Sequence, residues 1–113
     1  MAIPHAASGQ IVSVRPLGDA ISHSITTTLI KTGHLEVIRL ILPAGKEIAP
    51  HQVAGEITVQ CLEGEVELRA SGQSQTLPAG HLLYLNGNES HSLRGNQDSS
   101  VLVTIQLQPS SAG

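Results

Sequence analysis

The feature that most constrains this chain is the repeated interruption of short apolar runs by turn-forming residues. Runs rich in Val, Ile, Leu and Thr end at Thr32-Gly33, Glu63-Gly64, Pro78-Ala79-Gly80 and Asn86-Gly87. No window shows sustained helical periodicity, and short strands at near-regular spacing are typical of β-sandwiches and barrels. The sequence therefore predicts an all-β fold.

The strands themselves can be placed from the alternation of apolar and polar residues. We expect strands over residues 11–15, 24–31, 35–42, 56–62, 65–70, 74–77, 81–85, 91–94 and 101–107. Within 56–62, Ile57, Val59 and Cys61 share one face, while Glu56 and Gln60 lie on the other, because successive side chains of a strand point to opposite faces.

Composition limits the kind of protein. The chain has 113 residues, enough for one domain, with a net charge of −3, one Tyr, one Cys and no Trp or Phe. Scattered Lys and Arg residues and missing aromatic rings argue against a nucleic-acid partner. No apolar run reaches the roughly 18 residues of a membrane span, and no signal peptide is visible. We expect a cytoplasmic protein without a membrane partner.

Two stretches of the sequence have a similar layout of glycine, proline and histidine residues. Gly45, five residues and then His51 open the first, which ends at Leu62-Glu63-Gly64; Gly72, five residues and then Pro78-Ala79-Gly80 open the second, which reaches His91. The joint spacing resembles the two motifs of the cupin superfamily over residues 35–107. The resemblance implies a double-stranded β-helix, or jelly-roll barrel, with residues 1–34 as an N-terminal arm and strands of the same domain and 108–113 as a tail.

The resemblance also implies where a metal would bind, and this chain departs from that pattern. Metal-binding cupins typically use two histidines spaced as HxH, a glutamate and a later histidine; the matching positions here are His51, Val53, Ile57 and His91. Two imidazoles alone hold Zn, Ni, Mn or Fe weakly. Glu56 or Gln60 would complete a site only if a bulge at Ala54-Gly55 exchanged the strand's faces. The sequence therefore leaves two alternatives, one divalent metal bound per chain or no metal.

Seven residues form the expected pocket in the barrel mouth: His51, Val53, Ile57, Val59, Cys61, Tyr84 and His91. The two histidines should converge even without a metal. Cys61 is interpreted as a small buried apolar residue, because no Lys or Arg lies near it in the sequence to activate a thiol. Tyr84, within Leu-Leu-Tyr-Leu, is expected in the core or on the pocket wall, with core packing favoured.

The run Leu35 to Leu42 is apolar on both faces, which indicates a strand covered on both sides. In so short a chain we interpret the second cover as another copy, and we predict a homodimer formed largely through the N-terminal strands.

Three functions of different classes remain open. The first is a metal-assisted enzyme, dioxygenase- or isomerase-like by resemblance, acting on a small molecule. The second is a non-catalytic ligand sensor or interaction module, which the apolar Val53 and Ile57 favour. A third keeps catalysis without metal, with a histidine as general acid or base. Fold alone does not choose among them.

Overall fold

The computed structural model describes residues 5–107, so the predicted tail over 108–113 lies outside the described part. A short 3-10 helix, η1 (Gly18–His23), precedes the strands. They are β1 (Thr27–Lys31), β2 (Leu35–Leu42), β3 (Glu47–His51), β4 (Ile57–Glu63), β5 (Glu65–Ala70), β6 (Gln73–Pro78), β7 (Leu82–Leu85), β8 (His91–Gly95) and β9 (Ser99–Gln106). The prediction of an all-β chain is confirmed.

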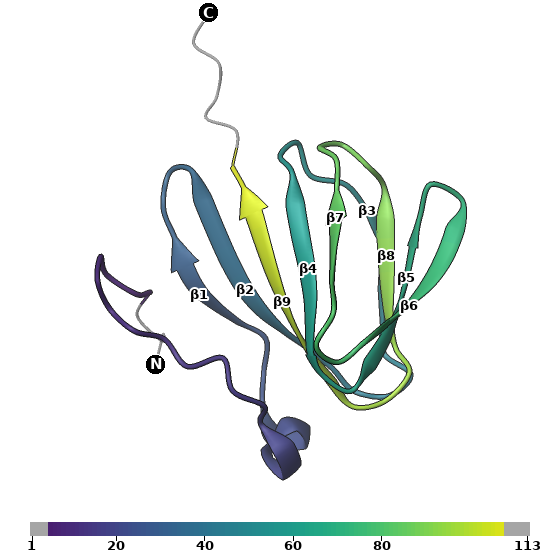
Figure 1. Ribbon diagram of the computed structural model, residues 1–113, viewed down its shortest axis with the longest axis horizontal. Helices are drawn as coiled ribbons and strands as arrows, with labels where there is room; N and C mark the ends of the chain where they lie inside the picture. The colour runs from purple at the N-terminus through teal and green to yellow at the C-terminus, as the bar shows by residue number, and fades with distance from the viewer. Residues whose placement is uncertain (1–4, 108–113) are drawn as a thin grey trace, which may run out of the picture.

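The strands form two antiparallel sheets that enclose the core (Figure 1). Sheet A has the order β1-β2-β9-β4-β7, and sheet B has the order β3-β8-β5-β6. The loops that follow β3 and β7 lie next to each other at one end of the barrel, at the top of Figure 1, and η1 lies at the opposite end. We call the first of these ends the mouth. No helix within residues 5–107 is long and apolar enough to cross a membrane.

Turn chemistry explains why strands end where they do. Ser71 and Gly72 both have positive φ, 53° and 71°, which is the conformation of a two-residue hairpin turn of type I′ and joins β5 to β6. Gly64 has φ 80°, and a Cβ at this position would lie 2.4 Å from the carbonyl oxygen of Asp98. The Glu63-Gly64 turn therefore requires glycine for both its backbone angle and its close packing.

One predicted strand is absent, and one observed strand was not predicted. Residues 11–15 form no strand; this segment crosses sheet A as irregular chain. Conversely, β3 was not expected, because its sequence, Glu-Ile-Ala-Pro-His, lacks an apolar alternation and contains a proline. Proline is tolerated here because β3 is an edge strand of sheet B and is bulged between Ile48 and His51.

The core follows the predicted parity of β4. Ile57, Val59 and Cys61 are all buried and belong to one apolar cluster with residues of both sheets. The other members are Leu42, Val66, Leu68, Leu77, Leu85, Leu93, Val101 and Val103. Because a one-residue slip would bury Glu56, Thr58 and Gln60 instead, this apolar face sets the register of β4 against β7 and β9.

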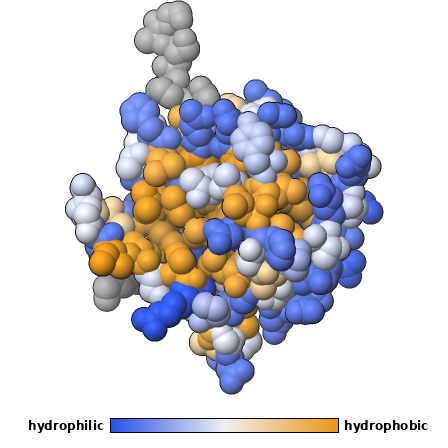
Figure 2. Space-filling view, viewed as in Figure 1, coloured by the Kyte–Doolittle hydropathy of each residue, from blue (hydrophilic) through white to orange (hydrophobic). Residues whose placement is uncertain are grey.

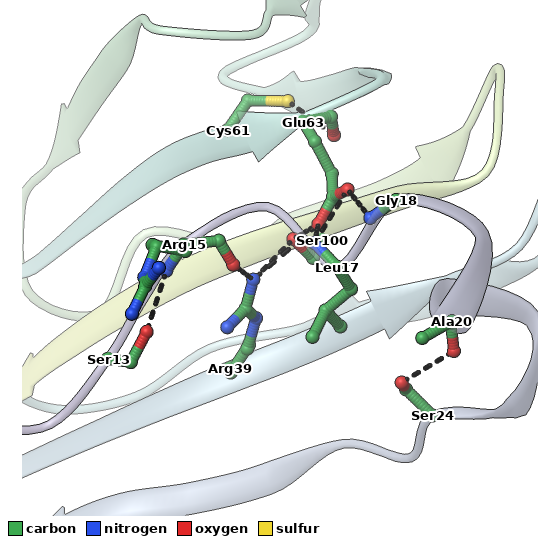
Figure 3. Close-up of polar contacts among 10 residues, drawn as sticks. All are labelled: Ser13, Arg15, Leu17, Gly18, Ala20, Ser24, Arg39, Cys61, Glu63 and Ser100. Atoms are coloured by element: carbon green, nitrogen blue, oxygen red, sulfur yellow. Dashed lines mark hydrogen bonds and ion pairs between the residues drawn. The ribbon is translucent and has the colours of Figure 1, made fainter.

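The outer face of β2 is covered in part by the chain's own N-terminal arm, a cover that the sequence pattern did not predict. Val37, Arg39 and Ile41 project from this face and are buried within the single chain. Arg15 of the arm lies against Arg39, and the arm is held by the Glu63 carboxylate, which accepts hydrogen bonds from the Leu17 and Gly18 backbone N–H groups at 2.8–3.0 Å (Figure 3).

Glu63 also joins the arm to the sheet beneath it. Ser100 Oγ donates to Glu63 Oε2 at 2.6 Å, and Arg39 Nη2 lies 3.5 Å from the same oxygen while donating to the Arg15 carbonyl (Figure 3). Both charged side chains are largely buried, 9% exposed for Arg39 and 15% for Glu63. Desolvation alone would raise the pKa of Glu63. The hydrogen bonds from Ser100, Leu17 and Gly18 and the charge of Arg39 outweigh it, so the pKa of Glu63 is lowered.

A Glu63→Gln substitution tests this anchor. The amide keeps the shape of the side chain but leaves Arg39 buried without its counter-charge, so we expect the free energy of unfolding at pH 7 to fall by ~3 kcal/mol. Since the pKa of Glu63 is lowered on folding, its stabilising effect is complete above the unfolded pKa of about 4.3. It should disappear as pH falls further through the folded value. Urea unfolding at several pH values measures this.

The matched control is Glu67→Gln. Glu67 pairs with Arg69 at 3.9 Å, but these side chains are 36% and 71% exposed, and exposed pairs contribute about 0–1 kcal/mol. Equal, small effects of the two substitutions would contradict the role given to Glu63.

Candidate functional site

The structure brings His51 and His91 together at the mouth. They are direct register partners on the neighbouring strands β3 and β8, and their ring centroids lie 4.3 Å apart at an interplanar angle of 55°. The bulge between Ile48 and His51 makes this pairing, because the extra residue returns His51 to the inward face. The predicted convergence of the two histidines is thus present in the fold.

Each imidazole is oriented by its own strand. His51 Nδ1 lies 3.1 Å from the Ala49 carbonyl oxygen, and His91 Nδ1 lies 3.0 Å from that of Glu89. Because a carbonyl can only accept, these contacts place the proton of a neutral ring on Nδ1 and leave Nε2 as a lone-pair acceptor. Within residues 5–107 no hydrogen bond involves either Nε2; His91 is 5% exposed as a residue, whereas His51 is exposed.

The histidines border an apolar cavity of about 170 Å³ inside the barrel. Apart from His51 and His91, every residue that lines it is aliphatic: Ile38, Leu40, Ile48, Val59, Leu93, Val103 and Ile105. These residues come from both sheets, so the cavity lies between them. A space of this kind favours an apolar ligand body with its polar group at the imidazoles.

Two glycines allow the loops at the mouth to pack closely. The Asn88 N–H donates to the Val53 carbonyl at 2.7 Å and ties the loop after β7 to the loop after β3. A Cβ on Gly87 would lie 2.3 Å from the Ala54 oxygen, and one on Gly55 would lie 1.5 Å from the Gln106 oxygen. Gly55 therefore serves this close approach, and the bulge considered at Ala54-Gly55 is instead found upstream, between Ile48 and His51.

Glu56 and Gln60 lie on the other side of sheet A from the histidines. Ile57 and Val59 occupy the inward face of β4, so their neighbours Glu56, Thr58 and Gln60 project outward. Glu56 Oε2 accepts a hydrogen bond from the Tyr84 hydroxyl at 2.9 Å, and that hydroxyl also lies 3.2 Å from Asn86 Oδ1. The Glu56 contact raises the pKa of Tyr84.

The sequence favoured core packing for Tyr84, and this prediction was wrong. Tyr84 does not line the cavity either. Its side chain is 53% exposed on the outer face of β7, opposite Thr58. The parity of β7 explains the error: Leu83 and Leu85 face inward, so Tyr84 must face outward.

The other expected pocket residues lie at different depths. Val59 lines the cavity, Val53 packs against the core near the mouth, and Ile57 and Cys61 lie fully within the core. Burial raises the pKa of the Cys61 thiol, whose Sγ donates to the Glu63 carbonyl at 3.4 Å. An inert structural role, as interpreted from the sequence, matches this position.

Several cavity residues were not named in advance. Ile38 and Leu40 of β2, Ile48 of β3 and Leu93 of β8 contribute to the walls, together with Val103 and Ile105 of β9. The alternation in β2 and β9 already placed some of these side chains on one face. The alternation alone did not show which face of β2 and β9 lies opposite the histidines.

The donor set does not fit a divalent metal centre of the usual cupin type. Within residues 5–107 no three His, Cys, Asp or Glu side chains are grouped so that they could hold a metal ion. His51 and His91 offer two nitrogens, while the positions that would add ligands are Val53 and Ile57. A closed or catalytic site needs three or four protein donors.

Two larger hollows, of about 490 and 280 Å³, run from the rim at His91 over the outer side of sheet B. They share Pro50, Arg69 and Ser92, and the second also contains Glu47, Glu67 and Arg94. Their charged side chains are solvent-facing neighbours of buried Leu68 and Leu93. We therefore place the candidate site in the apolar cavity, which the paired rings of His51 and His91 border.

Comparison with known proteins supports the fold. No protein-family model matches the chain, and no curated protein matches it. Solved structures do. An RmlC-like cupin from Desulfovibrio desulfuricans is 25% identical, with 90% of this chain and 97% of that one covered and a TM-score of 0.68. An RmlC-like cupin with a double-stranded β-helix fold from Methanocaldococcus jannaschii is 20% identical, covering 89% and 95%, with a TM-score of 0.71.

A predicted oxalate decarboxylase from Thermotoga maritima is 26% identical, covering 74% of this chain and 79% of that one, with a TM-score of 0.65. These similarities extend over most of each chain, and they confirm the resemblance seen in the two sequence motifs. With its two antiparallel sheets and its paired histidines at the mouth, the chain is a cupin-type protein with the double-stranded β-helix fold.

Proposed function

We propose that this protein binds a small organic molecule in the barrel cavity, without a divalent metal, through His51 and His91. The observation that supports this most is an aliphatic cavity of about 170 Å³ bordered by the paired rings of His51 and His91, whose centroids lie 4.3 Å apart. An apolar ligand that fills the cavity gains dispersion contacts and removes apolar surface from water. Polar groups of such a ligand would lie toward the mouth, where the imidazoles are.

Binding of a small apolar probe tests the cavity directly. We expect toluene to shift the methyl NMR signals of Val59, Val103 and Ile105, because apolar cavities of about 150 Å³ accept benzene-sized molecules. Ile38→Trp, which places a large ring in the same space, should abolish these shifts.

Leu82→Trp is the control, because Leu82 is 62% exposed on the outer face of sheet A. Equal toluene shifts in Ile38→Trp and Leu82→Trp, or none in the natural protein, would contradict binding in the cavity.

Metal loading separates this proposal from a metal-dependent cupin. We expect the untagged protein to retain far less than one equivalent of Zn²⁺, Ni²⁺, Mn²⁺ or Fe²⁺ after gel filtration, because two imidazoles leave most coordination positions to water. Plasma mass spectrometry measures the retained metal. Close to one equivalent, lost in His51→Ala but kept in His81→Ala, would overturn the metal-free proposal.

A second candidate keeps the same cavity but adds acid–base catalysis. It is favoured by the backbone contacts at Nδ1 that fix the orientation of each ring beside the cavity, since a general base needs a positioned lone pair. Turnover in metal-free protein that is lost in His91→Gln would support catalysis, whereas unchanged ligand without product would support binding alone.

We also propose that two copies associate through the mouth-side half of the outer face of sheet A. The arm covers the other half around Arg39 and Glu63, while Leu35 on β2 and Tyr84 on β7 remain 37% and 53% exposed. Figure 2 shows a broad hydrophobic area over the middle of the visible face of the barrel. Contiguous exposed apolar area is typical of association surfaces.

For this proposal we expect a dimer mass by light scattering at micromolar concentration, and a monomer for Leu35→Arg, because a symmetric interface would bring two added charges together. Ile11→Arg, at a position that is 94% exposed on the arm, should leave the mass unchanged. A monomeric natural protein would refute the proposal.

A further inference from the structure

We propose that β6 is a self-pairing edge, through which two copies of this chain join their B sheets in antiparallel fashion about a two-fold axis at Gln75. β6 lies at one edge of sheet B. This surface is separate from the barrel cavity and from the outer face of sheet A, so the inference goes beyond the function proposed above and does not depend on it. Three features support it: the unprotected edge of β6, the direction of its backbone groups, and the charges on β5 beside it.

The two sheets end in four edge strands, and three of these are protected against pairing with another chain. β1 is bulged between Thr28 and Ile30, and the Leu29 carbonyl already accepts a hydrogen bond from the Ala6 N–H of the arm. β7 has only four residues. β3 is bulged and contains Pro50. Bulges, prolines, short strands and covering segments are the usual means by which proteins prevent edge-to-edge association.

β6 is the remaining edge strand, and it is regular and uncharged. It pairs with β5 over six consecutive residues without a bulge, and its only proline is the last residue, Pro78. Residues 73–76 are neutral, polar and exposed. The β5–β6 hairpin lies at the right-hand edge of the barrel in Figure 1. A straight, exposed edge of this kind is a template for a further strand.

The hairpin fixes which backbone groups of β6 point to the free edge. Ala70 and Gln73 flank the two-residue turn, so they exchange both of their hydrogen bonds, and the bonding then alternates along the ladder. The N–H and C=O groups of Ser74 and Thr76 therefore point away from β5. Within residues 5–107 these four groups have no hydrogen-bond partner. An added strand would supply four hydrogen bonds.

Charge selects the register in which a second copy fits. On the solvent side of β5, Arg69 lies beside Ser74 and Glu67 lies beside Thr76. A two-fold axis at Ser74 would align Arg69 with the same residue of the second copy, and an axis at Thr76 would align two Glu67 side chains. An axis at Gln75 instead pairs Ser74 with Thr76 of the second copy. Each Arg69 then shares a cross-strand row with Glu67 of the other chain, so opposite charges face each other.

The same axis also satisfies the free backbone groups. The Ser74 N–H would donate to the Thr76 carbonyl of the second copy, and the Ser74 carbonyl would accept from the Thr76 N–H. Symmetry repeats both bonds, so all four groups of each chain are used. An axis at Thr76 would oppose Ser74 to Pro78, which has no N–H to donate.

This contact is weaker than the association proposed for sheet A. It consists mainly of backbone hydrogen bonds at a polar edge, and small polar contacts of this kind have dissociation constants on the order of 100 μM or above. Masses at micromolar concentration are therefore unaffected by it, and pairing of β6 becomes measurable at roughly 1 mM.

Sedimentation equilibrium of Leu35→Arg, in which the sheet A contact is removed, tests the proposal. We expect a monomer at micromolar concentration and mostly dimer at millimolar concentration. Gln75→Lys, added to this variant, should weaken dimerisation about 5-fold, because the axis places the two lysines directly opposite each other.

Gln73→Lys is the matched control, since it adds the same charge to the same face of the same strand. Its two lysines would be four residues out of line, or about 14 Å apart, which is beyond the screening length of about 8 Å at physiological ionic strength. We expect its effect on the dissociation constant to be less than about 2-fold.

Mixing charge variants tests the position of the axis. Gln75→Lys and Gln75→Glu should each dimerise poorly alone, whereas an equimolar mixture should dimerise at least as tightly as the parent, because a lysine then faces a glutamate. A misfolded chain would not regain affinity on mixing, so recovery also shows that both variants are folded.

Amide proton NMR provides a readout that is specific to the register. As the concentration rises, the Ser74 and Thr76 N–H resonances should move downfield, because they gain hydrogen bonds. The Gln75 N–H, which is already paired with Leu68 of β5, should move little.

Each contrary result overturns a defined part of the proposal. If Leu35→Arg stays monomeric at millimolar concentration, β6 is not a self-pairing edge, whatever sheet A does in the natural protein. If it dimerises but Gln75→Lys and Gln73→Lys weaken the dimer equally, or the mixture does not recover, the axis does not lie at Gln75. If the Ser74 and Thr76 amides do not shift as the dimer forms, the contact lies elsewhere on the molecule.

Discussion

The register of β4 is the constraint on which the rest of this structure depends. β4 lies between β9 and β7 in sheet A, and its face of Ile57, Val59 and Cys61 is almost wholly buried. Moving it by one residue would bury Glu56, Thr58 and Gln60, which would cost several kcal/mol for the carboxylate alone. The same register places Ile57 where a metal-binding cupin has its glutamate, so stability of the core and a third metal ligand are in direct conflict at this strand.

Period-two alternation is why so much of the barrel could be predicted from the sequence. It placed β2, β4, β5 and β9 and the inward faces of β4, β5 and β9, and the glycines at 64 and 72 marked the hairpin turns. The spacing of His51 and His91 from these turns then predicted their convergence. Each of these features is local, or is repeated often enough along the chain that one face of a strand is buried and the other is not.

What could not be predicted depended on contacts between distant segments. The bulge in β3 between Ile48 and His51 is stabilised by pairing with β8, and nothing near Pro50 in the sequence announces it. Likewise, Glu63 looks like a turn residue, yet its carboxylate anchors an arm that lies about 45 residues earlier in the chain. That arm explains why β2 can be apolar on both faces within a single chain, where the sequence pattern pointed to a second copy.

Both the predicted strand register and the unpredicted bulge of β3 determine which side chains lie at the mouth. In a chain with a histidine at the position of Val53 and a glutamate at that of Ile57, the two imidazoles would form part of a set of four metal ligands. With aliphatic side chains there, the imidazoles, oriented by the same backbone contacts at Nδ1, border a cavity whose other walls are aliphatic. Val53 and Ile57 therefore do two things at once: they remove two of the four ligands of the usual cupin pattern, and they pack with the apolar core instead. This double effect is the reason for proposing that the cavity binds a small molecule without a metal ion.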